Sequence, residues 1–183
     1  KVRPSREQLV HDFMQQMHTT MKRKGNVLIP TFAFHRSQEM AKRLDTAMIN
    51  GLLPKYNVYT ISNLAHRING YFNHHKSLFT KEIKQQKQPF NYKYVKHLYR
   101  TQQIQTPAVV ICTSGFGHAG ASLKLLGEWC GDEDNSVILT SGYLPPDSPL
   151  KQAKEEGFFK TDEGSFDVNC EVKQIELSGH ADQ

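Results

Sequence analysis

The residues best suited to catalysis lie near the end of the chain, where Ser178-Gly179-His180-Ala181-Asp182 follows an alternating apolar segment. Alternation predicts a strand, so His180 would sit at its carboxyl end with a carboxylate two residues away. A carboxylate beside an imidazole orients the ring and raises its basicity, which suits proton transfer to a leaving alkoxide. A histidine that only caps a turn explains the same residues equally well.

A second candidate site follows the apolar run Val109–Ile111, which predicts a strand buried on both faces. Small residues come next, among them Ser114, Gly115, Gly120 and Ser122. They lead into a helix predicted to reach about Trp129, and the free N–H groups at a helix start favour anions, most often phosphate. The spacing matches neither G-x-x-x-x-G-K-[ST] nor G-x-G-x-x-G. A turn that needs glycine for its backbone angles is an equally good explanation.

Arg36 follows another predicted strand, where its guanidinium could bind a backbone phosphate through two hydrogen bonds. A salt bridge to Glu39 is the alternative, and for a single arginine it is the favoured one. The nine histidines show no H-x-H or H-E-x-x-H spacing, and the three cysteines form no C-x-x-C pair. No metal site is therefore expected within this chain.

Alternating strands and helices must position these residues. Strands are predicted over 26–34, 56–61, 108–113, 136–141 and 168–177, the last nearer an edge. Helices are predicted over about 5–24, 37–50, 63–74, 94–103 and 122–129, with a short one that ends near 157. This order predicts an α/β fold of three layers, a mostly parallel β-sheet with helices on both faces. Ligands of such sheets bind at the carboxyl ends of the strands, so five loops are expected to share one site: 34–37, 62–65, 114–122, 142–148 and 178–182.

Composition narrows the class of protein. The chain has 183 residues, of which 38% are hydrophobic and 22% charged, and this predicts a single domain over 1–183. It shows no signal peptide and no apolar run that predicts a membrane span, and its unpaired cysteines favour a cytoplasmic location. Its net charge is +5, and lysines crowd the stretch from Lys76 to Arg100. Such crowding favours a polyanionic partner, although a solvated surface explains it as well. The first residue is Lys, so the chain is expected to be part of a longer protein.

Five stretches carry short motifs in a fixed order: Val27–Met40, Tyr59–Ala65, Val110–Leu123, Ile138–Lys151 and Val172–Asp182. The third contains T-S-G-F-G-H-A-G-A-S and the last contains S-G-H-A-D. Together they resemble the β-CASP domain of the metallo-β-lactamase-fold RNA nucleases, a Rossmann-like domain. His35 departs from the family pattern F-A-x-G-R-x-Q-E, because it stands where that pattern has glycine.

The resemblance implies a zinc-dependent ribonuclease that hydrolyses RNA phosphodiester bonds as an endo- or exonuclease. Its two zinc ions would be held by a metallo-β-lactamase domain outside this chain, and this domain would clamp single-stranded RNA against that one. His180 would be the general acid and Asp182 its partner. The implied phosphate-binding residues are Arg36, Ser62, Ser114, Gly115, Gly120, Ser122, Ser148 and Lys151. The fragment alone is expected to be inactive and to bind no zinc.

Three other functions fit the residues less well. They are a non-catalytic RNA-binding scaffold subunit, a DNA-processing nuclease of the same superfamily, and an unrelated α/β nucleotide-binding domain. An H-x-H-x-D-H motif upstream would favour the enzyme over the scaffold. A homo-oligomer is compatible with each function, and no membrane partner is expected.

Overall fold

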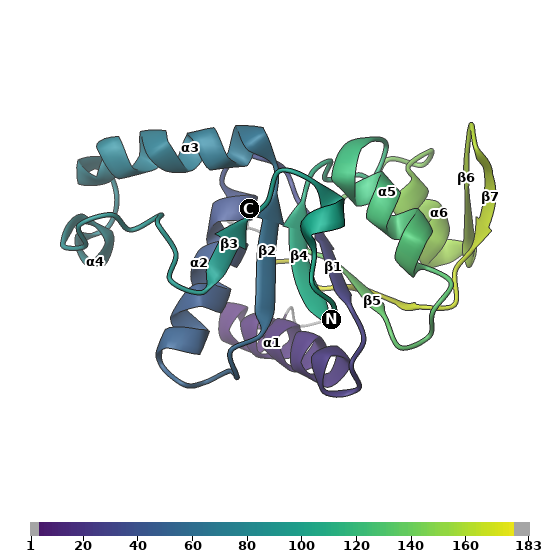
Figure 1. Ribbon diagram of the computed structural model, residues 1–183, viewed down its shortest axis with the longest axis horizontal. Helices are drawn as coiled ribbons and strands as arrows, with labels where there is room; N and C mark the ends of the chain where they lie inside the picture. Colours follow the sequence, from purple (N-terminus) through teal and green to yellow (C-terminus); the bar gives the residue numbers. More distant parts are fainter. Residues whose placement is uncertain (1–3, 178–183) are drawn as a thin grey trace.

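The computed structural model describes residues 4–177, so His180 and Asp182 lie outside the described residues. Six strands form one parallel sheet in the order β3-β2-β4-β1-β5-β8 (Figure 1). Their bounds are Val27–Pro30 for β1, Asn57–Ile61 for β2, Val95–His97 for β3, Ala108–Cys112 for β4, Ser136–Leu139 for β5 and Glu171–Gln174 for β8. The predicted α/β fold is confirmed, and β8 is an edge strand, as the alternating pattern of 168–177 indicated.

Helices cover both faces of the sheet. α1 (Arg6–Lys22) and α2 (Arg36–Ile49) pack on one face, whereas α5 (Gly120–Trp129) and α6 (Pro149–Glu155) pack on the other. Successive residues of a strand point to opposite faces, so Ile111 joins the first layer and Val110 the second. Both side chains are fully buried. This two-sided burial explains why the central strand is apolar at every position.

The two central strands, β1 and β4, send the chain in opposite directions. From β1 the chain crosses through α2 to β2, and from β4 it crosses through α5 to β5 on the opposite face. When the connections of two neighbouring parallel strands leave toward opposite faces of the sheet, a crevice remains between the carboxyl ends of those strands. The fold therefore predicts one preferred binding position, beside the ends of β1 and β4.

The strand predicted over 26–34 ends at Pro30, and two other regions differ more from the sequence-based prediction. Residues 94–103 do not form a helix, because Val95 pairs with Val58 of β2 and starts β3, which a short 3₁₀ turn, η2 (Thr101–Gln103), follows. The carboxylate of Asp45 on α2 accepts a hydrogen bond from the N–H of Tyr94 at 2.6 Å and fixes the start of that strand.

The second difference is a hairpin made by β6 (Phe158–Thr161) and β7 (Gly164–Asp167), which the sequence did not predict. Its strands are held by the stacked rings of Phe159 and Phe166, whose centroids lie 5.0 Å apart. The predicted last strand is shortened accordingly and begins at Glu171.

Residues 62–93 extend beyond the β3 edge of the sheet (Figure 1). They contain α3 (Asn63–His74), the 3₁₀ turn η1 (Lys76–Leu78) and α4 (Lys81–Lys84), and we call this segment the basic arm. Among residues 4–177, none of the helices is long and apolar enough to span a membrane.

Candidate functional site at the carboxyl edge of the sheet

A pocket of about 440 Å³ opens at the carboxyl ends of β1, β4 and β5. Its walls are the turn between β1 and α2, Gly115 from the loop after β4, and the segment from Thr140 to Gly142 after β5. The pocket thus occupies the crevice that is expected where the connections after β1 and β4 leave toward opposite faces of the sheet. It is the candidate functional site of the described residues.

The β1–α2 turn has an unusual backbone at His35. The residue has φ of 67° and ψ of −60°, and the N–H of Arg36 donates a hydrogen bond to the Phe34 carbonyl at 2.8 Å. These values define a γ-turn of the rarer hand, which strains a residue that carries a Cβ atom. The strain explains why a glycine suits this position in the related motif. The turn aims the N-terminus of α2 at the pocket, and no side chain caps that N-terminus.

Arg36 lines the pocket and is held from behind by Glu39. Its Nη1 lies 2.5 Å from Glu39 Oε2, whereas Glu39 Oε1 accepts hydrogen bonds from Arg6 at 2.8 Å and from Arg43 at 2.9 Å. The salt bridge that the sequence favoured is therefore present. It does not remove Arg36 from the pocket, because one carboxylate is shared by three guanidinium groups and the cluster keeps an excess of positive charge.

The ionisation of Glu39 follows from these contacts. Burial alone would raise the pKa of the Glu39 carboxyl, but the hydrogen bond from Arg43 and the charges of Arg36, Arg43 and Arg6 together hold it below its ordinary value. Burial lowers the pKa of the Arg36 guanidinium, and Glu39 opposes that change. An arginine keeps its proton at any ordinary pH, so both groups are charged at neutral pH.

Gly115 and Gly120 give the loop after β4 its shape. A Cβ atom at Gly115 would lie 3.1 Å from the Phe32 ring, so a larger residue there would push this ring outward by a few tenths of an ångström. Gly120 has φ of 73°, and a Cβ atom there would lie 3.1 Å from the Thr113 carbonyl oxygen. Gly115 lines the pocket, whereas Gly120 lines a neighbouring groove beside α5.

The predicted serines serve the backbone rather than the pocket. Ser62 accepts a hydrogen bond from the N–H of Ala65 at 3.2 Å and caps α3, and Ser148 caps α6 in the same way. Ser122 is fully buried and donates to the Ala119 carbonyl at 3.3 Å. These three hydroxyls hold loops and helix ends in place, so we assign them no phosphate contact. Sequence reasoning selected them correctly as loop residues but could not see where their hydroxyls point.

Two further predicted residues also lie outside the pocket. Ser114 is half-buried and accepts a long hydrogen bond of 3.4 Å from the N–H of Ala119 within its own loop. Lys151 sits on α6, where its Nζ lies 3.8 Å from Glu155 Oε2. Of the eight predicted phosphate-binding residues, the structure brings Arg36 and Gly115 together at one pocket.

Sequence reasoning missed several pocket residues. Phe32 and Phe34 expose 48% and 64% of their surface at its rim, and the hydroxyl of Thr31 is buried in its wall without a hydrogen-bond partner among the described residues. All three directly follow β1 at its carboxyl end. That position was the available signal, because exposed aromatic residues at the binding edge of a parallel sheet are candidates for ligand contact.

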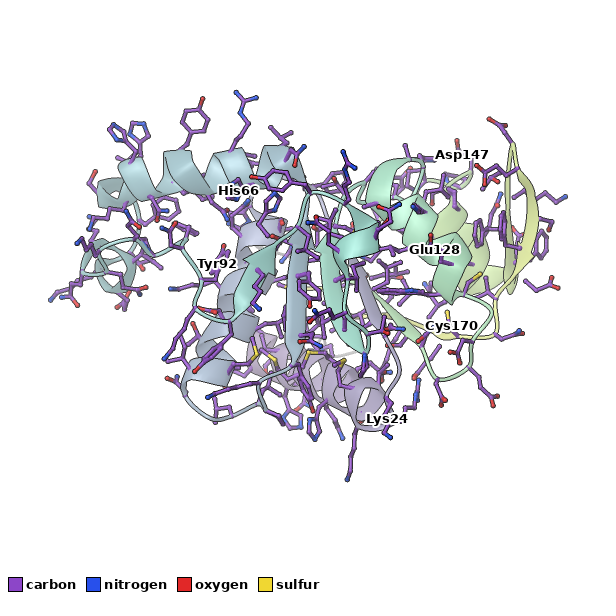
Figure 2. The ribbon with its side chains drawn as sticks, viewed as in Figure 1. Lys24, His66, Tyr92, Glu128, Asp147 and Cys170 are labelled. Carbon is purple, nitrogen blue, oxygen red and sulfur yellow. The ribbon has the colours of Figure 1, made fainter. Side chains whose placement is uncertain are left out.

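Residues 4–177 contain no group of three or more histidine, cysteine or acidic side chains that could hold a metal ion. His118, in the loop before α5, lies 4.0 Å from Asp147, which precedes α6 (Figure 2 labels Asp147). Both side chains are largely exposed, so this contact is a weak surface pair.

Residues 37–149 match the model of the Beta-Casp domain family. Integrator complex subunit 11 of Danio rerio is 31% identical over 192 residues, which cover 99% of this chain and 31% of that protein. Endoribonuclease YSH1 of Eremothecium gossypii is 30% identical over 186 residues, or 92% of this chain and 24% of that protein. Cleavage and polyadenylation specificity factor subunit 3 of Dictyostelium discoideum is 26% identical over 178 residues, or 93% and 23%. The chain thus spans less than a third of the length of each of these relatives.

Proposed function

Because the chain belongs to the β-CASP domain family, we propose that its pocket at the carboxyl edge of the sheet binds the phosphate backbone of single-stranded RNA. The observation that carries the proposal is Arg36, which lines the pocket beside the uncapped N-terminus of α2. A guanidinium makes charge-assisted hydrogen bonds to phosphate oxygens, and the helix dipole adds positive potential at the same place. Glu39 fixes the guanidinium, so little side-chain freedom is lost on binding.

The rim of the pocket supports a nucleic acid over a free phosphate ion. The exposed rings of Phe32 and Phe34 offer apolar faces on which a base or a sugar can pack. Phe32 is itself supported by an edge contact with Phe116, whose ring centroid lies 4.9 Å away. A charged group flanked by exposed aromatic rings is the usual composition of a single-strand binding site.

We assign hydrolysis to the larger protein of which this domain would be a part. The relative YSH1 is named an endoribonuclease, which supports an RNA-hydrolysing parent protein. The described residues hold no ligand set that fits a pair of zinc ions, so residues elsewhere in the larger protein would have to hold them. His180 and Asp182 stay predictions for the general acid and its partner, and the isolated chain is expected to bind RNA without cutting it.

The test compares two arginines that share one carboxylate. Arg36→Gln removes the guanidinium from the pocket, whereas Arg43→Gln removes another partner of Glu39 that lies outside this pocket. The measurement is the affinity of the 183-residue chain for a four-nucleotide RNA. We expect Arg36→Gln to weaken binding about tenfold and Arg43→Gln to change it less than threefold. Equal losses in the two variants would contradict a specific role for the pocket.

A competition experiment separates RNA from DNA. Unlabelled RNA and DNA oligonucleotides of the same sequence compete with labelled RNA for the chain. We expect RNA to compete better, and equal or better competition by DNA would favour the DNA-processing alternative.

A further inference from the structure

We propose that the basic arm, residues 62–93, is a second binding surface that guides single-stranded RNA away from the pocket. This inference rests on the proposed function, because it extends the path of the same ligand. It assigns a role to a segment that contains only one of the predicted phosphate-binding residues, Ser62. It also implies that the chain contacts several nucleotides beyond those in the pocket.

The arm holds the entire charge excess of the chain. Residues 62–93 contain six lysine and arginine side chains and one acidic side chain, Glu82. The whole chain has 23 basic and 18 acidic side chains, so the remainder contains 17 of each and is neutral overall. A local excess of this kind attracts a polyanion and releases its counterions on binding.

The arm begins at the pocket. Gln38 Nε2 donates to the carbonyl oxygens of Ala33, in the β1–α2 turn, and of Ala65, in the first turn of α3, at 3.0 and 3.2 Å. The pocket residue Phe34 also makes an edge contact with Phe72 of α3, with ring centroids 5.6 Å apart. A strand of RNA that leaves the pocket on this side therefore meets α3 first.

The outer face of α3 suits that ligand. Arg67, Tyr71 and His74 follow one another at spacings of four and three residues, which places them on one side of the helix. All three are exposed, Tyr71 to 61%, and α3 contains no acidic residue. A helix of this length spans about 18 Å, enough for several nucleotides. A guanidinium beside two aromatic rings can bind a backbone phosphate and stack on neighbouring bases.

The end of the arm presents further lysines on an ordered support. Phe72 packs edge to face against Phe79 and Phe90, which are tilted against each other, and the three centroids lie 5.1 to 5.3 Å apart in a small aromatic core. Lys76 turns inward and donates to the Gln86 carbonyl oxygen at 2.6 Å, so it closes the loop and is not available to a ligand.

Four of the other five cations of the arm stay free for a partner. Arg67, Lys81, Lys84 and Lys87 are exposed, and within residues 4–177 none of them forms an ion pair. The fifth, Lys93, lies over the ring of Tyr94, 5.1 Å from its centroid. Both an anionic membrane and RNA would satisfy such cations. Continuity with the pocket and the exposed ring of Tyr71 favour RNA, and the membrane becomes an outcome of the test.

The test uses the 183-residue chain with two single-stranded RNAs, of four and fifteen nucleotides. The variant Lys81→Gln/Lys84→Gln/Lys87→Gln removes three cations from the arm. We expect it to weaken binding of the longer RNA at 50 mM salt about tenfold or more, and to leave the shorter RNA unaffected. The slope of log affinity against log salt should fall by about 2, since each contact with a single strand contributes about 0.7.

A second triple variant provides the control. Lys22→Gln/Lys124→Gln/Lys160→Gln removes the same charge from exposed positions outside the arm. It should retain the salt slope of the parent chain. Equal losses in the two triple variants would overturn the proposal, because net charge alone would then explain them. Circular dichroism spectra and melting temperatures that match the parent chain would exclude misfolding as the cause.

Two further comparisons separate the possible failures. If both RNAs bind and the arm variant has no effect, the arm proposal fails while the pocket stands. If only the longer RNA binds and the arm variant abolishes that binding, the pocket proposal fails instead. Binding to vesicles of phosphatidylserine and phosphatidylcholine that displaces the RNA would overturn the arm as an RNA surface.

Tyr71 tests the stacking part of the proposal. Tyr71→Ala should weaken binding of the fifteen-nucleotide RNA about tenfold, and Tyr71→Phe should restore it because the ring is retained. Equal losses in the two variants would contradict stacking on this ring.

Discussion

The pocket and the basic arm use positive charge in opposite ways. At the pocket, three arginines surround Glu39, which holds Arg36 at 2.5 Å and carries a lowered pKa. On the arm, the exposed cations have no carboxylate partner among the described residues and stand on a surface with a single acidic residue. A paired guanidinium is positioned and fixes geometry, whereas unpaired lysines supply long-range attraction that salt screens. The pocket should therefore determine which nucleotide of the RNA binds at Arg36, and the arm should determine how tightly the RNA binds.

The largest effect on stability is expected from removal of the Glu39 carboxylate behind the pocket. Glu39→Gln leaves three guanidinium groups crowded around a neutral amide and should lower the free energy of unfolding by about 2–3 kcal/mol. Urea denaturation measures it. Glu82→Gln, in the arm, should leave stability unchanged, because that carboxylate is fully exposed. If the two variants were equally stable, the contrast between paired and unpaired charge would have no energetic basis.

The next effect concerns the backbone beside the pocket. Gly120→Ala forces a Cβ atom into a residue with φ of 73° and toward the Thr113 carbonyl oxygen, so it should destabilise the chain by about 1–2 kcal/mol. Gly131→Ala is the matched control, since φ is ordinary there and the space around it is open. Thermal unfolding of both variants checks this. A stable Gly120→Ala variant would show that the loop can adopt another path.

In the arm, replacement of a glycine by alanine should raise the stability of the chain, whereas it should lower it at Gly120. Gly70 lies inside α3, and a Cβ atom there would meet nothing within 4 Å. Gly70→Ala should therefore stabilise the chain by about 0.5–1 kcal/mol, because alanine favours the helix. Thermal unfolding again measures it. Destabilisation would mean that the arm, like the pocket, depends on a close backbone approach.

The smallest effect is a pH dependence where the arm joins the sheet. His97 on β3 stacks on His66 of α3 at 4.2 Å, beside the ring of Tyr99, and its Nδ1 lies 3.4 Å from the Thr60 hydroxyl (Figure 2 labels His66). Burial, and secondly the charge of His66, lower the pKa of His97 below its ordinary value. The folded state then binds fewer protons than the unfolded one, so stability is present above the unfolded pKa of about 6.5 and is lost as the pH falls below it.

Melting temperatures at pH 7.5 and 5.5 test this linkage. The parent chain should melt at a lower temperature at pH 5.5, and His97→Gln should show a smaller difference between the two pH values. His18→Gln is the control, because His18 lies on α1, far from β3 in the chain, and bonds to Tyr56. If His97→Gln kept the full difference in melting temperature between the two pH values, groups other than His97 would be responsible for it.

The sequence predicted the sheet well because a strand buried on both faces is apolar at every position. The unbroken apolar run Val109–Ile111 of β4 identifies positions that the structure buries completely. The prediction failed at β3, where three residues form a strand only because β2 offers an edge and Asp45 fixes the first N–H groups. Those partners are distant in sequence, so no local pattern reports them.

The site was predicted less well than the fold. Glycines drew attention to the loop after β4, but the pocket depends equally on the β1–α2 turn, where His35 adopts a conformation that its residue type does not announce. Serines are recognisable in a sequence as loop residues, yet whether a hydroxyl faces a ligand or caps a helix depends on three-dimensional contacts. Arg36 illustrates the same limit, because the predicted salt bridge and the predicted binding role coexist.

The strand order has a consequence for synthesis on the ribosome. β1 pairs with β4 and β5, so Val27 finds its first strand partner only at Val109. At about 5–20 residues per second, roughly 80 further residues take about 4–16 s to be made. During that interval β1 is an apolar segment with both edges open, and the basic arm is complete before the central strand exists. Contacts between such distant segments form slowly, so β1 is most exposed to aggregation before β4 emerges.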